Sequence, residues 1–305
     1  MPVDISLVGA GYMGSIHLEK LLTLEDVHVP GIVDIDRCTG KNLSERHNVM
    51  FFDDYREAVA LSDGIVIASP TETHYEIARY CIEKGVHVFI EKPMARDVKE
   101  AAQLIDMARD KGVVLQIGHL ERFNPAFKKA VEFIENPIIV EAKRTGPYTG
   151  RSTDIDVVSD LMIHDIDLLL CIVKAKVRTV SKSYGISFIN DKEDVATATI
   201  EFENNCIATL HVNRVSTKKE RSFTVFERGR AVYIDLLNGR LSVNTKKQER
   251  EIETLDYEAG KIDSVREELK EFVDSIQGRA RPTVDGTAGL MALEIVNLIR
   301  TSLER

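Results

Sequence analysis

The sequence predicts an α/β protein of two domains: an N-terminal doubly wound parallel sheet, then an α/β domain with a large open, mostly antiparallel sheet. Three observations lead to this fold class. The chain has 305 residues, which suits two domains better than one. Its first third alternates short β-branched runs with helical patterns, and after about Gly118 the strands lengthen and alternate in polarity. We therefore expect one domain over residues 1–118 and a second over residues 119–305.

The first domain repeats the order strand, helix, strand, which is typical of parallel strands joined by right-handed crossovers. Its short, continuously apolar runs indicate strands that are buried on both faces of the sheet. Glycines after several helical patterns mark where those helices end. The expected strands are Val3–Val8, Val27–Val33, Gly64–Ala68, Val86–Ile90 and Val114–Ile117, and the expected helices are Gly14–Leu24, Thr73–Lys84 and Val98–Lys111.

The second domain begins its strands at about Ile138 and joins two of them through the hairpin-type connection Glu203–Asn205. Asn238-Gly239 marks another tight turn, and Asn244–Glu253 is expected to be a solvated strand or loop. The later strands are expected at Asp194–Phe202, Cys206–Asn213, Ser222–Phe226, Ala231–Asp235 and Arg240–Val243, and helices at Val157–Val173, Ser264–Gly278 and Gly286–Glu304. An open sheet of this type has one face that helices need not cover, and such a face often packs against a second copy. We expect a homodimer or homotetramer, with the apolar strand residues Ala198, Ile200, Phe202 and Leu210 as examples of that face.

Composition limits the kinds of partner. The chain carries 40 basic and 49 acidic side chains, a formal charge of -9, and such a surface repels nucleic acid overall. Neither a secretory signal nor an apolar run of membrane-spanning length is visible. The four cysteines are widely spaced and form no zinc pattern, which is typical of reduced thiols in a cytoplasmic protein. We therefore expect a soluble cytoplasmic protein without nucleic-acid or membrane partners.

The segment Gly9-Ala10-Gly11-Tyr12-Met13-Gly14 follows the first strand directly and opens a helix. In that context the spacing of the three glycines predicts a dinucleotide-binding Rossmann turn. Gly9 permits the tight turn, Gly11 lets the backbone approach a pyrophosphate, and Gly14 lets the helix pack close to the strand. The alternative is an ordinary glycine-rich turn with no ligand.

An acidic residue at the end of the second strand points to the cofactor. Asp34 lies twenty residues after Gly14, where a carboxylate can accept hydrogen bonds from the adenosine ribose and would repel a 2′-phosphate. Arg37 weakens that preference, since a guanidinium there can bind a 2′-phosphate or stack on adenine. The residues favour NAD over NADP.

Two further segments carry groups suited to proton transfer. Glu91-Lys92-Pro93 follows a strand at the carboxyl edge of the sheet, where ligands bind, so Lys92 is a candidate acid or base unless it is a plain surface lysine. Asp160 and His164 are spaced to share one helix face, with Asp167 one turn further on. A histidine with a carboxylate one turn away is a plausible general base, although acids at a helix start are also common for structural reasons. A single histidine in this segment predicts no metal site.

Together these three motifs resemble those of the Gfo/Idh/MocA oxidoreductases, over nearly the whole chain. The resemblance implies that Lys92, Asp160 and His164 carry the chemistry. It also implies that Tyr12, Met13 and Glu91 lie in the cofactor site. The segment Ala68–Thr71, which contains Ser69 and Thr71, and the nearby His74 are expected at the edge of the cofactor. His74 has a second interpretation as a plain helix-start residue.

A narrower resemblance involves the segments Gly118–Pro125 and Gly146–Asp160, which are similar to those of dehydrogenases acting on the C3 hydroxyl of UDP-N-acetylglucosamine. It implies a 3-keto sugar nucleotide that is passed to a partner aminotransferase, on a route to lipid A or other surface glycans. Arginine and amide side chains in and near these segments are candidates for binding the diphosphate and the sugar: Arg122, Asn124, Arg144 and Arg151. The alternatives are a dehydrogenase of a free sugar or polyol such as inositol, and a dinucleotide-sensing regulator without turnover.

Overall fold

The structure is a computed structural model that describes residues 2–150, 155–189, 191–260 and 262–304. It divides into two compact units, which are described separately. The first comprises the N-terminus to Leu120 together with Asp263–Leu290, and the second comprises Glu121–Ile262 with Met291 to the C-terminus. Among the described ranges, no helix is both long and apolar enough to cross a membrane.

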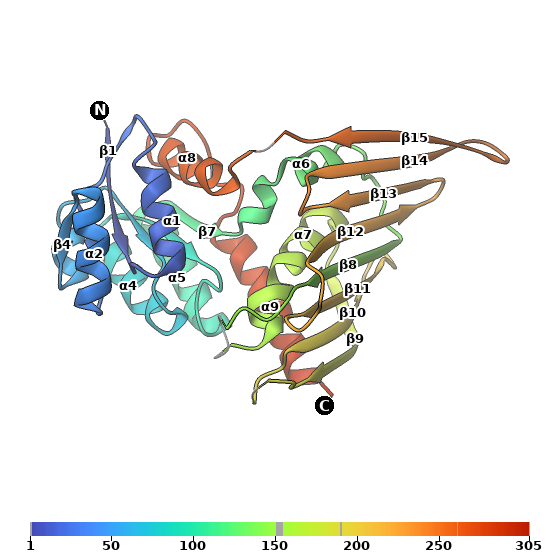
Figure 1. Ribbon diagram of the computed structural model, residues 1–305, viewed down its shortest axis with the longest axis horizontal. Coiled ribbons are helices and arrows are strands. Elements are labelled where there is room, and N and C mark those ends of the chain that lie inside the picture. The colour runs from blue at the N-terminus through green and yellow to red at the C-terminus, as the bar shows by residue number, and fades with distance from the viewer. Residues whose placement is uncertain (1, 151–154, 190, 261, 305) are drawn as a thin grey trace. The chain divides into compact units, whose positions relative to one another are not determined.

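The first unit has a wholly parallel sheet whose strand order reverses at β1 (Figure 1). The order is β4-β3-β1-β5-β6-β7, and the short β2 pairs with the start of β1. In open α/β sheets, ligands bind at the carboxyl ends of the strands where the order reverses, which are here β1 and β5. The elements are β1 (Val3–Val8), α1 (Tyr12–Leu21), β2 (Val27–His28), β3 (Gly31–Val33), α2 (Arg37–His47), β4 (Met50–Phe52), α3 (Tyr55–Val59), β5 (Gly64–Ile67), α4 (Thr71–Glu83), β6 (His87–Glu91), α5 (Val98–Lys111), β7 (Leu115–Gly118) and, running past Leu120, the 3-10 turn η1 (Leu120–Phe123).

The helix α8 (Ser264–Ile276) returns to this first unit after the second unit is complete. α8 belongs to this unit because its apolar residues Leu269 and Phe272 are buried in one cluster with Leu7 and Phe89. In consequence, α8 packs beside α1. The predicted contiguous domain 119–305 therefore differs from the compact unit in residues 263–290. Chain order alone does not show that a helix returns to an earlier core.

The second unit is built on an eight-stranded mixed sheet in the order β15-β14-β13-β12-β8-β11-β10-β9. All neighbours are antiparallel except β8 and β11. Helices lie along one face of the sheet, and the ribbons of the described residues place none on the other (Figure 1). The elements are α6 (Pro125–Val131), β8 (Ile139–Thr145), the π-helix η2 (Val158–Met162), α7 (Ile163–Val173), β9 (Val177–Ile186), β10 (Val195–Phe202), β11 (Ile207–Asn213), β12 (Glu220–Glu227), β13 (Arg230–Asp235), β14 (Arg240–Gln248), β15 (Glu251–Glu258) and the end of α9 (Gly286–Ser302), which the unit boundary crosses.

The predicted fold class is confirmed, but the residues offered for the open face were wrong. Ala198, Ile200, Phe202 and Leu210 are all buried in the core that the helices cover. Alternation places their neighbours on the other face instead, and there Ile207 on β11 pairs in register with Ile139 on β8. Both isoleucines are nearly half exposed, at 46% and 47%. The alternation of residues along each strand predicts two different faces of the sheet. It does not indicate which of the two faces the helices cover.

Candidate functional site

The glycine turn between β1 and α1 shows why each glycine is needed. A Cβ on Gly9, whose φ is +100°, would lie 2.5 Å from the backbone nitrogen of Ser69, and a Cβ on Gly14 would lie 1.8 Å from the carbonyl oxygen of Gly9. These two glycines are therefore required by the fold itself. A Cβ on Gly11 would meet nothing within 4 Å. Because the fold leaves that space open, Gly11 is free to admit a close ligand.

The helix α1 begins at Tyr12 without a side-chain cap and without an acidic residue in its first turn. Such a helix start presents backbone N–H groups and a positive dipole end to an anion. Tyr12 is exposed and Met13 half-buried beside it. The turn and the helix start together fit the pyrophosphate of a dinucleotide.

Asp34 and Arg37 lie close to the turn but have different partners. One carboxylate oxygen of Asp34 accepts the Ala10 N–H at 2.6 Å, and the other accepts the Asp36 N–H at 2.8 Å. A carboxylate has further lone pairs, so Asp34 can still accept ribose hydroxyls. Arg37 donates to both oxygens of Asp53, with Nε 2.7 Å from Oδ1. That pairing gives any further anion at this place a competitor for the guanidinium.

His74 holds the segment after β5 in place through contacts with the backbone. His74 is 1% exposed, its Nε2 lies 2.8 Å from the carbonyl oxygen of Ser69, and its Nδ1 lies 2.9 Å from that of Pro93. Burial lowers the pKa of His74. Both neighbours of the ring are backbone carbonyls, and a neutral ring donates to only one of them, so His74 braces this segment from within the chain while its cofactor contact stays a prediction. Ser69 shares a hydrogen bond with Thr73 through its hydroxyl, and Thr71 is half-buried at the start of α4. Both stay candidates for binding the cofactor.

Lys92 follows the last residue of β6 directly and is half-buried, and the peptide bond between Lys92 and Pro93 is cis. Glu91 is 7% exposed and points into the unit, where its carboxylate meets Nε2 of His17 at 2.6 Å. Glu91 therefore anchors the strand end from inside, and its contact with the cofactor stays a prediction. Lys92 remains the candidate for chemistry.

In the second unit, Asp160 and His164 belong to a helix that is otherwise mostly buried. The sequence predicted one α-helix over Val157–Val173, but Val158–Met162 is a π-helix, and the α-helix begins at Ile163. Isolated π-helical turns occur frequently at functional sites. Asp160 and His164 are half-buried, while Asp165 and Asp167 are fully buried. The polar pair is thus accessible at the start of an apolar helix.

A buried ion network lies behind that pair. Arg144, 3% exposed, donates to Glu121 at 2.8 Å and to Asp165 at 2.7 Å, and Arg221 also reaches Glu121 at 3.2 Å. Burial alone would raise the pKa of Glu121, but Arg144 and Arg221 outweigh it and hold that pKa below its usual range. For Asp165 burial wins over Arg144, and its pKa is raised. Arg144 therefore supports the fold and is not presented to a ligand.

The other predicted substrate contacts have mixed outcomes. Arg122 forms a two-bond pair with Asp167, at 2.9 Å and 2.8 Å, so Asp167 serves Arg122 and not His164 as the sequence suggested. Asn124 caps α6 by accepting the Ala126 N–H, and its amide donates to a backbone carbonyl at 2.9 Å. These contacts give Asn124 a structural role, and its contact with a substrate stays a prediction. Arg151 lies outside the described residues.

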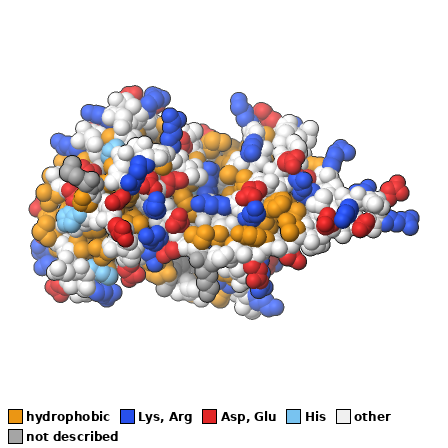
Figure 2. Space-filling view, turned by 90° about the horizontal axis from the view of Figure 1, so that it is seen from above, with side chains coloured by type: hydrophobic (Ala, Val, Ile, Leu, Met, Phe, Trp, Pro, Cys, Tyr) orange, Lys and Arg blue, Asp and Glu red, His pale blue; other side chains and the backbone are white. Residues whose placement is uncertain are grey.

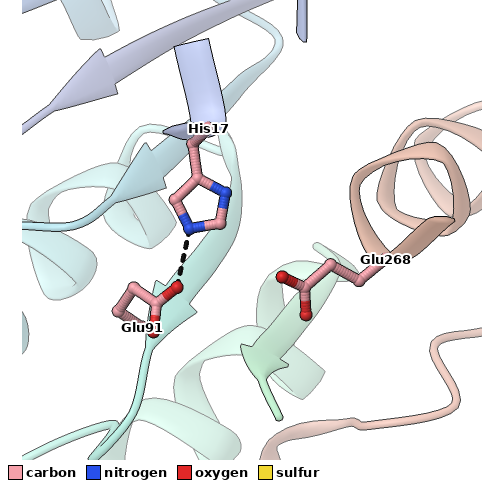
Figure 3. A group of neighbouring side chains, drawn as sticks. All are labelled: His17, Glu91 and Glu268. Carbon is pink, nitrogen blue, oxygen red and sulfur yellow. Dashed lines mark hydrogen bonds and ion pairs between the residues drawn. The ribbon is translucent and has the colours of Figure 1, made fainter. Parts of the chain in front are cut away.

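Sequence reasoning missed three residues that the structure brings into the cofactor unit. Asp53, the partner of Arg37, stands just after β4, a strand that was not predicted. His17 and Glu268 are both 0% exposed and lie beside Glu91 (Figure 3). The sequence could have indicated His17 and Glu268, because each occupies a position on the apolar face of its helix where a hydrophobic residue is expected.

The surface seen in Figure 2 mixes acidic and basic side chains. No field of one sign extends over the described part of that face, as an extended nucleic-acid surface would require. This agrees with the acidic composition of the chain.

Comparison with known proteins gives matches over nearly all of the chain. The model for an oxidoreductase family with an NAD-binding Rossmann fold, Gfo/Idh/MocA, matches residues 3–119, and the model of its C-terminal alpha/beta domain matches residues 150–305. UDP-N-acetylglucosamine 3-dehydrogenase of Acidithiobacillus ferrooxidans is 30% identical over 98% of this chain and 96% of its own length. Its solved structure has a TM-score of 0.94 at 29% identity, and the match covers 99% of this chain and 98% of that one. Myo-inositol 2-dehydrogenase of Thermotoga maritima is 26% identical over 98% of this chain and 96% of its own.

Proposed function

Because this chain belongs to the Gfo/Idh/MocA family of nicotinamide-dependent oxidoreductases, we propose that it oxidises the C3 hydroxyl of UDP-N-acetylglucosamine to the 3-keto sugar nucleotide. The observation that carries the proposal is the half-buried pair Asp160 and His164 on an otherwise mostly buried helix. Full-length similarity to a UDP-N-acetylglucosamine 3-dehydrogenase supports the choice of substrate. The product, a ketone on a sugar nucleotide, is chemically suited to a later transamination by a partner aminotransferase.

We propose NAD as the cofactor. Asp34 stands where a carboxylate accepts ribose hydroxyls and repels a 2′-phosphate. Arg37, the nearby cation in a position to attract that phosphate, is held by Asp53. Both features favour NAD, and NADP is the weaker alternative.

The chemistry divides between a hydride and a proton. NAD, held by the glycine turn and Asp34, would supply the acceptor for the hydride that leaves C3. His164 or Lys92 accepts the proton of the C3 hydroxyl as general base, and the sequence and geometry leave the choice between them open. As an ammonium group, Lys92 stabilises the alkoxide that develops on the sugar oxygen. Asp160 orients His164 or contacts the sugar. The secondary alcohol leaves as a ketone, so no further oxidant is needed.

The direct test mixes the protein with NAD and UDP-N-acetylglucosamine and follows the absorbance band of reduced nicotinamide. The same assay with NADP tests cofactor choice, and myo-inositol tests the polyol alternative that the similarity to an inositol dehydrogenase supports. We expect turnover with the UDP-sugar and NAD. A larger kcat/KM for myo-inositol would make the polyol dehydrogenase correct. Normal NADH binding without turnover on any sugar or polyol would support the regulator alternative.

We also propose that the open sheet face forms a homodimer or homotetramer contact. Ile139 and Ile207 are register partners on neighbouring strands of that face, and each is nearly half exposed. An apolar surface of this kind on a sheet is stabilised when a second copy covers it. Light scattering at micromolar concentration tests this, and a monomer would contradict it. Replacing Ile207 by Glu is expected to shift the protein toward the monomer.

A further inference from the structure

A buried polar cluster lies beneath the strand end that carries Lys92. His17 comes from α1, Glu91 ends β6, and Glu268 comes from α8, and all three belong to the first unit (Figure 3). One nitrogen or carboxylate oxygen from each lies within 4.8 Å of the others. His17 and Glu268 are 0% exposed and Glu91 is 7% exposed. Polar groups this deeply buried require hydrogen-bond partners.

The first link of the cluster joins the pyrophosphate helix to the lysine strand. Nε2 of His17 lies 2.6 Å from Oε1 of Glu91, and Oε2 of Glu91 accepts the backbone N–H of Lys92 at 3.2 Å. Burial alone would raise the pKa of Glu91, but the hydrogen bond and charge of His17, followed by the charge of Lys92, outweigh it and lower that pKa. Glu91 is therefore an acceptor. It follows that Nε2 of His17 carries the hydrogen in this bond.

The second link of the cluster concerns His17 and Glu268. With the hydrogen of this bond on Nε2, the His17 ring leaves Nδ1 for a second partner. Within the described part of the chain, neither Nδ1 of His17 nor either carboxylate oxygen of Glu268 has a hydrogen-bond partner. Burial and the nearby charge of Glu91 raise the pKa of Glu268 well above its usual range, which favours its protonated form. Two buried polar groups without partners in the described ranges thus stand in one small cluster, where one bridging water can join them.

We propose that Glu268 is a positioning residue for Lys92, joined to Nδ1 of His17 through one bridging water and so keeping on Nε2 the hydrogen that holds Glu91 against the Lys92 backbone. The role of Lys92 in this inference rests on the proposed function. Partners that orient a histidine through its second nitrogen commonly set its tautomer and ring position in other sites. Here the oriented group is the strand end that delivers Lys92. Glu268 acts through His17 and Glu91 and touches neither cofactor nor substrate.

The same three residue types can bind a metal ion, but the geometry favours hydrogen bonds. At 2.6 Å, Nε2 of His17 and Oε1 of Glu91 share a hydrogen. Two ligands of one ion, each about 2.1 Å from it, lie roughly 3 Å or more apart. The His17 ring also packs edge-on against Phe89, with centroids 5.3 Å apart. A bound divalent cation is therefore the outcome that would replace the proposal.

The test compares Glu268→Gln with Glu268→Leu. Glutamine keeps a hydrogen-bond donor at this place, while leucine has a similar size and no donor. With UDP-N-acetylglucosamine and NAD, we expect kcat of E268Q within about twofold of the unsubstituted protein. We expect kcat of E268L to fall about ten- to a hundredfold, because small misplacements of catalytic groups cost that much. The affinity for NADH, followed by NADH fluorescence in a chain without tryptophan, should stay within about twofold in both.

A second readout needs no substrate, so it separates failure of this inference from failure of the proposed function. Nitrogen NMR of ¹⁵N-histidine-labelled protein, with His17→Gln for assignment, reports the ring tautomer. We expect the Nε2–H form of His17 in the unsubstituted protein and in E268Q, and a mixture in E268L. An Nδ1–H form in the unsubstituted protein would overturn the proposal even if E268L does not fold. It would also be overturned by equal kcat for E268L and the unsubstituted protein, by E268Q as impaired as E268L, or by one tightly bound metal ion per chain that E268Q loses.

Discussion

Arg37 and Asp53 form a two-bond ion pair at the edge of the dinucleotide turn, with Nε of Arg37 2.7 Å from Oδ1 of Asp53. Both side chains are more than half exposed, at 67% and 52%, so the pair contributes little to stability. The ion pair matters instead for the choice between NAD and NADP. Asp53 accepts from Nε and one Nη of Arg37, so a 2′-phosphate would compete with Asp53 for the guanidinium.

Replacing Asp53 by Asn removes the competing charge and keeps the size of the side chain. We expect kcat/KM with NADP to rise several-fold, since a phosphate contact from arginine is a charge-assisted hydrogen bond, while kcat/KM with NAD stays nearly constant. The control is Arg37→Ala on the Asp53→Asn background, which should abolish the gain. A gain that survives without Arg37 would show that the pair does not govern cofactor choice.

Gly11 and Gly14 offer a matched pair of substitutions in one turn. Alanine at Gly11 has open space around its Cβ, so the fold should stay intact and only NADH binding should weaken, by roughly tenfold or more if the pyrophosphate sits there. Alanine at Gly14 places Cβ 1.8 Å from a backbone oxygen and should destabilise the fold by about 3 kcal/mol or more. Thermal unfolding and NADH titration measure the two effects. Unchanged NADH affinity in Gly11→Ala would contradict the predicted cofactor position.

The glycine turn was predictable because local spacing and local backbone geometry determine it. The strand Val3–Val8 and the helix Val98–Lys111 were also predicted with the bounds that the structure gives them. Helices α2 and α3 and strand β4 were missed, because they are short or lack an apolar periodicity. Pro30 lies between β2 and β3, which the sequence joined into one strand.

Contacts between distant segments were not predictable from spacing. Arg122, Asn124 and Arg144 have the right chemistry for a phosphate or a sugar, but partners far along the chain bind all three. Glu268 meets His17 and Glu91 only because α8 returns to the first unit. Residue type and position indicate which chemistry is possible, whereas the tertiary partners decide whether a side chain serves the fold or a ligand.

Lys92→Met and His164→Asn test the chemical roles directly. Each removes one candidate proton acceptor, and general acid–base groups typically contribute a hundredfold to ten-thousandfold. We therefore expect kcat to fall by at least about a hundredfold in one or both, with NADH affinity within a few-fold of normal. The variant with the larger loss, and with a changed pH–rate profile, identifies the base. Full turnover in Lys92→Met with normal NAD binding would refute the proposed scheme.

Arg144→Leu separates a structural arginine from a substrate contact. It leaves Glu121 and Asp165 buried without their main cation, and breaking a buried pair in this way costs about 3–5 kcal/mol. We expect a large loss of unfolding free energy, measured by denaturant titration. At a temperature where the variant is folded, KM for the sugar nucleotide should change little. A raised KM in a fully stable variant would assign Arg144 to the substrate instead.

The last prediction concerns how stability depends on pH through Glu268. Its pKa is raised by burial first, and then by the charges of Glu91 on β6, Glu271 on the same helix and Asp263 at the cap of that helix, where Lys20 of α1 pairs with Asp263. A group whose pKa is raised in the fold stabilises it fully below its unfolded pKa, near 4.5, and that stability is lost as pH rises toward the folded pKa. Glu268→Gln cannot ionise. We therefore expect E268Q to unfold at a higher temperature than the unsubstituted protein at pH 8, with a difference that shrinks as pH falls toward 4.5. Calorimetry over this range measures it, and a difference that is constant with pH would show that Glu268 does not keep its proton in the folded state.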